Sequence, residues 1–334
     1  MTHKENRSSF SRRTLLKGIG AGAAALTVGS TLVRVSGISA QSNPTPASEA
    51  AFYRFRVGSF DVTVITDGYL NLPPAVLGTN APEGAVSALL ADNYLPTDLF
   101  TAPAHVMLVN TGEQLVLIDT GLGGVALPGF ETDSGKLVPT MQLLGLDPAD
   151  VNAVIVSHAH PDHIGGIRDS EGNPQFPNAT YHISQLEWDF WMNAATDTDN
   201  DLANFFATLA QNTLLPLEDR VQRFEGETDI LPGIRVVPAA GHTPGHTAVI
   251  IGTGDDRVIN IADATLHYII GLEEPTWQTG LEVDPVVAEQ SRVALLSRAS
   301  GERIKVFGYH FPFPGIGYAV RDGESERWEF VITG

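Results

Sequence analysis

One stretch decides the fold expected for this chain: VIVSHAHPDHIGG, residues 154–166. Its apolar, β-branched start predicts a buried strand, and the proline and paired glycines predict the loop that ends it. Four side chains of metal-binding types follow within six residues: His158, His160, Asp162 and His163. Alternation along an extended segment would direct His158 and His160 to one side. Imidazoles and a carboxylate suit zinc, iron or manganese, so the stretch predicts a metal site at the end of a strand.

Three later residues of the same types also follow apolar runs. His242 comes after residues 234–238, Asp263 after residues 258–262, and His310 after residues 305–308. Each run is typical of a buried strand. Layered α/β proteins usually hold their sites at one edge, beyond the strand ends. We therefore expect these three side chains to lie beside the 158–163 loop.

The rest of the chain alternates between strand and helix patterns. Further strands are expected at residues 53–57, 60–66, 106–110, 115–118, 179–183, 248–252, 318–321 and 328–332. Helices are expected at residues 82–92, 139–144, 185–191, 201–214 and 285–300. Ser184 and Glu187 have the spacing of a capping box that opens the third of these helices. Locally paired strands interrupted by helices predict one layered α/β domain over residues 52–334 rather than two domains.

The ligand-type residues follow a family pattern. The motif His158-x-His160-x-Asp162-His163, with Asp119-Thr120-Gly121 before it and His242, Asp263 and His310 after it, resembles the metallo-β-lactamase superfamily. The resemblance runs from about Phe52 to the C-terminus and implies an αββα four-layer sandwich. It also implies two divalent metal ions, with zinc expected first and manganese, iron or cobalt as alternatives.

The same resemblance implies a role for each ligand-type residue. One ion would be held by His158, His160 and His242, and the other by Asp162, His163 and His310. Asp263 would bridge the two ions. Asp119 would support the site by orienting a ligand imidazole.

The implied chemistry is hydrolysis. Two metal ions about 3.5–4 Å apart can share one hydroxide, lower its pKa toward neutrality and polarise the bond under attack. We expect this hydroxide to attack a lactone carbonyl, an ester carbonyl or a phosphotriester phosphorus. Asp162 and Asp263 are the expected catalytic residues, with Asp162 as the proton shuttle.

Some residues discriminate within the superfamily. Class B β-lactamases usually place Cys at the position of Asp263 and lack the equivalent of His163. The stretch GYHFPFPGIG, residues 308–317, and the Pro-, Gly-, Leu- and Tyr-rich residues 69–103 are similar to the methyl parathion hydrolase and N-acyl-homoserine lactonase branch. Two alternatives stay open: a glyoxalase-type thioesterase, which shares the seven ligands, and an iron-dependent oxygen or redox enzyme of the same fold.

Substrate specificity is expected to lie in residues 69–103 and in the loops after Asp263 and His310, because a segment this long between strands is usually functional. His246 is expected to pack or hydrogen-bond beneath the metal site. The candidates for an apolar substrate pocket are two residues after Asp263 and four aromatic residues, although aromatic residues at helical spacing are more often core. These six are Leu266, His267, Trp188, Trp191, Phe311 and Phe313.

The N-terminal residues have the pattern of an export signal. Ser11-Arg12-Arg13-Thr14-Leu15-Leu16-Lys17 precedes a Gly- and Ala-rich apolar segment and resembles the twin-arginine signal, with Leu15 in the place of Phe. The apolar segment is shorter than the ~20 residues that span a bilayer, so no stable membrane anchor is expected. We expect residues 1–40 to be a signal peptide, residues 41–51 to be a linker, and the protein to be periplasmic or secreted.

Charge and cysteine content restrict the partners. The full chain has a net charge of −19, and removal of residues 1–40 takes away six basic and one acidic residue, leaving 14 − 38 = −24. Such a charge repels nucleic acid and anionic membranes, which argues against a nuclease. The chain has no cysteine, so disulfides and thiolate ligands are excluded. The expected partner is a small ester-like molecule, and a homodimer stays open.

Overall fold

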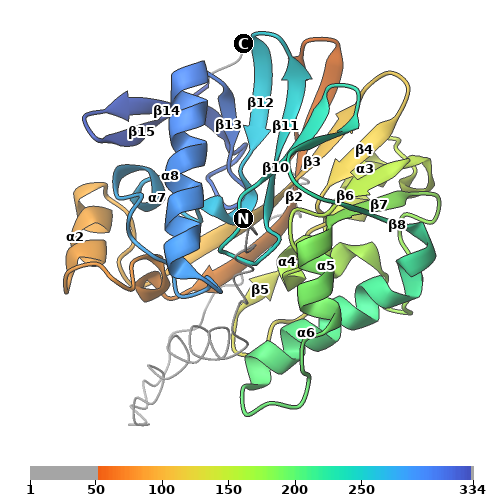
Figure 1. Ribbon diagram of the computed structural model, residues 1–334, viewed down its shortest axis with the longest axis horizontal. Helices are drawn as coiled ribbons and strands as arrows, with labels where there is room; N and C mark the ends of the chain where they lie inside the picture. Colours follow the sequence, from red (N-terminus) through yellow and green to blue (C-terminus); the bar gives the residue numbers. More distant parts are fainter. Residues whose placement is uncertain (1–51, 332–334) are drawn as a thin grey trace, which may run out of the picture.

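Two β-sheets lie face to face in the computed structural model, which describes residues 52–331 (Figure 1). The first sheet has the strand order β1-β2-β3-β4-β6-β7-β8, with β5 paired to β2, and the second has the order β15-β14-β13-β12-β11-β10-β9. The strands of the first sheet are β1 Phe52–Val57, β2 Phe60–Leu72, β3 Phe100–Asn110, β4 Leu115–Ile118, β5 Thr132–Asp133, β6 Ala153–Ile155, β7 Thr180–Ser184 and β8 Val221–Phe224. Those of the second are β9 Thr228–Leu231, β10 Ile234–Pro238, β11 Thr247–Thr253, β12 Asp256–Asn260, β13 Lys305–Phe307, β14 Ile316–Asp322 and β15 Ser325–Phe330.

Helices cover the outer faces of both sheets (Figure 1). On the second sheet α8 packs against β14 and α7 against β15, whereas α3 and α5 pack on the first sheet, with α6 beside α5. The α-helices are α2 Ala85–Asp92, α3 Leu137–Leu143, α4 Pro161–Ile164, α5 Gln185–Met192, α6 Asp201–Leu214, α7 Ile270–Glu273 and α8 Pro285–Glu302. Short 3₁₀ helices span Pro74–Leu77, Pro148–Asp150, Gly165–Ile167, Leu215–Arg220 and Ala262–Ala264. Asp284 begins α8 by accepting a hydrogen bond from the Val287 amide, as an N-cap residue does.

The apolar strands of the second sheet bury both of their faces. Along β11, Val249 and Ile251 belong to the core between the sheets, whereas Ala248 and Ile250 belong to the core beneath α8. This alternation follows from the period of two in an extended strand. It produces four layers: helices, first sheet, second sheet and helices.

The carboxyl ends of several strands meet at one edge of the sandwich. β4, β6 and β7 are parallel neighbours in the first sheet, and β12 and β13 are parallel neighbours in the second. The segments that follow β4, β6, β10, β12 and β13 carry the ligand-type residues found in the sequence. The topology therefore brings these residues together from positions far apart in the chain.

The structure corrects several predicted boundaries. The segment expected at residues 69–103 is shorter, because β2 continues to Leu72 and pairs there with the start of β3 at Phe100. The helix expected from Pro139 begins at Leu137, which leaves the proline in the first turn where it is tolerated. The predicted capping box is absent: Ser184 is the N-cap of α5, but its side chain makes no cap hydrogen bond. Strands β5, β8 and β9 and helix α7 were not predicted, since each has only two to four residues.

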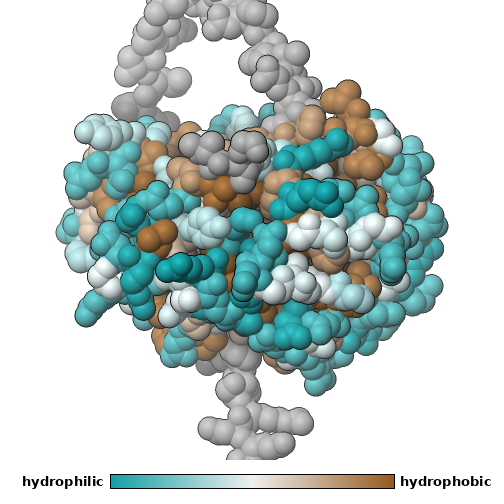
Figure 2. Space-filling model, turned by 90° about the horizontal axis from the view of Figure 1, so that it is seen from above, coloured by the Kyte–Doolittle hydropathy of each residue, from teal (hydrophilic) through white to brown (hydrophobic). Residues whose placement is uncertain are grey.

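Two sequence predictions fall outside the described residues: the signal peptide at residues 1–40 and the linker at residues 41–51. Among the residues that are described, no helix combines the length and apolarity needed to cross a membrane. Figure 2 shows hydrophilic residues over most of the face that it presents, with smaller hydrophobic areas between them.

Candidate metal centre

The loop after β6 is shaped so that four side chains converge. His160 is the N-cap of α4 and has extended backbone angles, and Pro161 occupies the first helical position, which its fixed φ favours. The single turn of α4 then carries Asp162 and His163. Two Gly residues follow, and a Cβ at Gly165 would lie 2.2 Å from the carbonyl oxygen of Leu122. The close approach of this loop to the 119–124 segment thus requires glycine.

The structure brings all seven candidate ligands into one buried cluster. His158, His160, His242 and Asp263 each offer an atom within 4.8 Å of the others, and so do Asp162, His163 and His310. Asp263 lies between the two groups. Its Oδ2 is 3.3 Å from His242 Nε2 and 3.3 Å from His310 Nε2. Its Oδ1 is 3.1 Å from His163 Nε2.

The donor atoms suit divalent cations. Ligand bonds of about 2.0–2.1 Å in a tetrahedral zinc site place neighbouring donor atoms about 3.3 Å apart. The corresponding distances are 2.9 Å between His160 Nδ1 and His242 Nε2, and 3.4 Å between Asp162 Oδ2 and His310 Nε2. Buried polar atoms normally have hydrogen-bond partners. Three atoms that face the cluster have none: His158 Nε2, His163 Nε2 and Asp263 Oδ1.

The electrostatics of the cluster also favour a cation. Burial lowers the pKa of His158 and His242 well below the usual value and that of His160 to about 3, so all three imidazoles are neutral, as metal ligation requires. His163 behaves differently. Burial lowers its pKa, but the carboxylates of Asp263, Asp162 and Asp119 outweigh burial and raise it. A positive charge is therefore stabilised at this end of the cluster.

Asp119 is placed to orient His163. It is fully buried directly after β4, and its φ of +61° is unusual for a residue with a side chain. Its Oδ2 accepts a hydrogen bond from His163 Nδ1 at 2.9 Å, and both oxygens accept bonds from Ser157. The proton on Nδ1 leaves Nε2 of His163 free to face Asp263.

Two further imidazoles are oriented by backbone groups. His310 Nδ1 donates to the Pro103 carbonyl at 2.7 Å, which directs its Nε2 toward Asp263. His246 donates from Nδ1 to the Ala239 carbonyl and accepts at Nε2 from the amide of Asp263. The expectation that His246 hydrogen-bonds beneath the site is confirmed, and its partner is the backbone of Asp263.

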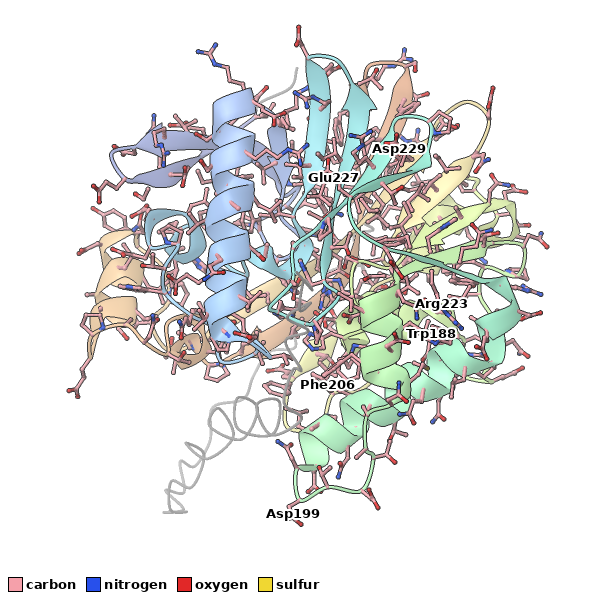
Figure 3. The ribbon with its side chains drawn as sticks, in the orientation of Figure 1. Trp188, Asp199, Phe206, Arg223, Glu227 and Asp229 are labelled. Atoms are coloured by element: carbon pink, nitrogen blue, oxygen red, sulfur yellow. The ribbon has the colours of Figure 1, made fainter. Side chains whose placement is uncertain are left out.

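The structure changes the view of the pocket candidates. Phe311 is fully buried against Trp328 in the core beneath α8, so it lines no open pocket. Trp188 is also buried and lies under the guanidinium of Arg223 on β8 (Figure 3). Phe313 is 41 % exposed beside His105.

The remaining candidates are nearer the cluster. The Trp191 ring lies 5.7 Å from that of His160. Leu266 and His267 are buried after Asp263, and His267 Nδ1 accepts from two amides at the start of α7.

The sequence did not identify Phe206 as a neighbour of the candidate metal centre, and it wrongly assigned Glu187 to a capping box. Phe206 lies on α6 (Figure 3). Its ring centroid is 5.2 Å from that of His160. Only the apolar face of α6 pointed to a buried Phe206, and nothing local indicated what it would cover. A separate pocket of about 580 Å³ is lined by residues of the 73–87 stretch together with Thr97 and Asp98.

Curated relatives align over part of this chain. An N-acyl homoserine lactonase from Bacillus sp. is 27 % identical over 175 residues, which is 47 % of this chain and 62 % of the relative. A probable metallo-hydrolase from Mycobacterium bovis is 28 % identical over 183 residues, 49 % of this chain and 57 % of the relative. The chain thus spans about three fifths of the length of the curated relatives it matches.

Solved structures align over most of the chain. The dizinc quorum-quenching lactonase AidC, solved with the product N-hexanoyl-L-homoserine, has a TM-score of 0.78 and 27 % identity over 85 % of this chain and 99 % of its own. The hydrolase AbOPH of the β-lactamase superfamily has a TM-score of 0.77 and 26 % identity over the same shares. Residues 100–310 match the family model described as metallo-beta-lactamase superfamily. With more than half of its residues in that match, this chain belongs to the metallo-β-lactamase superfamily.

Proposed function

We propose that this chain is a hydrolase that uses two divalent metal ions, zinc first, to cleave lactones, esters or phosphotriesters. One observation carries the proposal: seven buried ligand-type side chains form two groups, and Asp263 lies within 3.3 Å of members of both. A shared carboxylate between two groups of three is the arrangement needed for a binuclear site. Two such ions would supply an activated water nucleophile at neutral pH and would polarise the bond under attack.

The side chains of the chain have separate tasks in this proposal. His158, His160 and His242 would hold one ion, and Asp162, His163 and His310 would hold the other, with Asp263 common to both. Asp119 keeps the Nε2 atom of His163 directed at the site.

Asp162 is the most exposed of the seven residues, at 8 %. Because its carboxylate is the ligand group most open to solvent, we assign proton transfer to Asp162. Trp191 and Phe206 would exclude water from the side of His160.

Lactones are the first substrates to test. The similarity to AidC, at 27 % identity over 99 % of that chain, supports them over other esters. The net charge of −19 favours uncharged or weakly charged small substrates and disfavours nucleic acid.

The test is a substrate panel on metal-defined protein. Zinc-, manganese- and iron-loaded samples would be assayed with lactones, aryl esters, thioesters and phosphotriesters, together with metal analysis. We expect two metal ions per chain and hydrolysis of lactones. Activity confined to thioesters would favour a glyoxalase-type enzyme, and oxygen uptake by the iron form would favour a redox enzyme.

We also propose export through the twin-arginine route. The support is the pair Arg12 and Arg13 ahead of the apolar segment. Fractionation of cells that express the full chain should find the shortened protein outside the cytoplasm, and replacement of both arginines by lysine should retain it inside. Export of the Arg12→Lys/Arg13→Lys variant to the periplasm at the wild-type level would contradict this assignment.

A further inference from the structure

Glu187 is a buried carboxylate that, within residues 52–331, touches neither a cationic side chain nor a candidate ligand. It has no exposed surface, and it lies on the first turn of α5. Four donors contact its two oxygens. The Ala159 amide and Trp191 Nε1 donate to Oε1 at 2.9 and 2.7 Å, and Thr243 Oγ1 and the Gly245 amide donate to Oε2 at 2.6 and 3.0 Å. A buried carboxylate without a cation is costly, so its retention calls for a function.

The partners of Glu187 identify that function. Ala159 stands between His158 and His160, and Thr243 directly follows His242. Oε1 therefore holds the loop from the first sheet, while Oε2 holds the loop from the second. These two loops carry all three histidines of the first ligand group, His158, His160 and His242.

An independent observation shows how closely α5 and the second loop approach. A Cβ on Gly245 would lie 2.2 Å from the amide nitrogen of Glu187 and 2.6 Å from its Cα. The loop thus rests directly on the backbone of α5. Since metal sites require ligand positions within about 0.2 Å, a contact that sets the distance between two loops also sets the quality of the site.

The second ligand group is supported by other contacts. Asp119 orients His163, Tyr309 Oη donates to the Asp162 carbonyl at 2.6 Å, and the Pro103 carbonyl orients His310. None of the four hydrogen bonds of Glu187 reaches these residues. Glu187 therefore supports the first group alone among the residues that the structure describes, whereas Asp119 reaches both groups, because Ser157 Oγ lies between Asp119 Oδ2 and His158 Nδ1.

We infer that Glu187 is a positioning residue that sets the spacing of the first metal position by joining the two ligand loops. This inference rests on the proposed binuclear site and deepens it. Its consequence is selective: loss of Glu187 weakens metal binding by His158, His160 and His242 and leaves the other group intact.

The main variant is Glu187→Gln, which keeps the size of the side chain. A glutamine amide accepts hydrogen bonds at one end only, so one of the two loops loses its partner. We expect zinc affinity at the first position to fall by 10- to 100-fold, as for other groups that orient metal ligands. Thr243→Val removes one of the four bonds and should have a smaller effect in the same direction, and it provides the test if Glu187→Gln does not fold.

Zinc binding to the metal-free full chain would be measured by competition with a chelator and by metal analysis. The variant would be combined with His242→Ala and with His310→Ala. We expect no further loss of affinity in the His242 double variant, because that change already removes the first position. We expect an added loss in the His310 double variant, where only the first position remains.

Tyr181→Phe is the matched control. It removes a buried hydrogen bond, from Tyr181 Oη to the Phe176 carbonyl, on β7 directly before α5, without touching either ligand loop. It should lower the unfolding temperature and leave zinc affinity unchanged.

Three results would overturn the inference: wild-type zinc affinity in Glu187→Gln, an added loss in the His242 double variant, or an equal loss in Tyr181→Phe. Failure of the proposed function is distinguishable, because it would appear as absence of zinc binding or of hydrolysis in the wild-type chain.

Discussion

The first sheet brings four candidate ligands to the site on one loop of six residues, whereas the second sheet brings three from three separate loops. In the first case Pro161 and the turn of α4 fix the relative positions of neighbours, so the contacts from Glu187 to Ala159 and from Asp119 to His163 hold the loop as one unit. In the second case each ligand depends on a distant contact. His242 is held through the 274–284 loop, Asp263 through His246, and His310 through Pro103. The second sheet is therefore where the site is most open to damage by remote substitutions.

The largest effect is expected from Asp263→Ala. This change removes the one carboxylate shared by both groups, so we expect hydrolysis to fall by at least about 1,000-fold, with loss of bound metal. Kinetics and metal analysis on the purified variant measure both. Asp255→Asn, in the exposed turn before β12, is the control and should behave as wild type. Normal turnover by Asp263→Ala would refute the shared-ligand assignment.

Arg292→Met should weaken the support of His242. Two guanidinium nitrogens of Arg292 each contact Glu282 Oε1 at 3.0 Å in a buried pair, and the adjacent Val283 amide donates to the His242 carbonyl. Breaking one partner of such a pair costs about 3–5 kcal/mol of unfolding free energy. Urea unfolding measures the loss, and the Glu282→Gln/Arg292→Met double variant should recover part of it. Unchanged zinc affinity in Arg292→Met would show that His242 is positioned independently of this loop.

His246→Asn tests the support of Asp263. The shorter side chain cannot span from the Ala239 carbonyl to the Asp263 amide, so the backbone of Asp263 loses its partner. We expect zinc affinity to fall by about 10- to 100-fold. His182→Asn, on β7, is a control outside the cluster. Equal effects of the two changes would argue that His246 serves general stability alone.

The smallest effect concerns pH and His105, which joins β3 to the residues on either side of His310. Burial lowers the pKa of His105 from 6.5 to about 3 and outweighs the hydrogen bond from its Nε2 to the Phe311 carbonyl, which acts in the opposite direction. The unfolded chain therefore binds more protons between these pH values, and the stability contribution is complete above pH 6.5 and is lost as pH falls toward 3. Between pH 7 and pH 5 the loss is about 2 kcal/mol.

His105→Gln removes this titration. The difference in unfolding free energy between wild type and His105→Gln, measured at pH 7 and pH 5, should change by that amount in favour of the variant. A difference that does not depend on pH would mean that His105 titrates normally.

The family and the fold could be predicted from sequence because their signals are local. The ligand-type residues follow short apolar runs, and the structure gathers all seven in one cluster. The capping-box prediction for Glu187 was wrong because it relied on a local signal alone. Its spacing from Ser184 fits a capping box, but its partners on the 159 and 243–245 loops are set by tertiary packing. The prediction that Phe311 and Trp188 line a substrate pocket was wrong for a similar reason. An aromatic residue beside a motif does not reveal which face of the strand or helix it occupies.

The hydrogen bond from His310 to the Pro103 carbonyl has a consequence for the evolution of specificity. Pro103 is the fourth residue of β3, the strand through which the 73–99 segment re-enters the sheet. Replacement of that segment is therefore not neutral for the chemistry, because a shift in the register of β3 moves the carbonyl that orients a candidate ligand. Grafts that preserve the pairing of Tyr69 with Pro103 should change substrate preference alone, while grafts that alter it should also reduce metal occupancy.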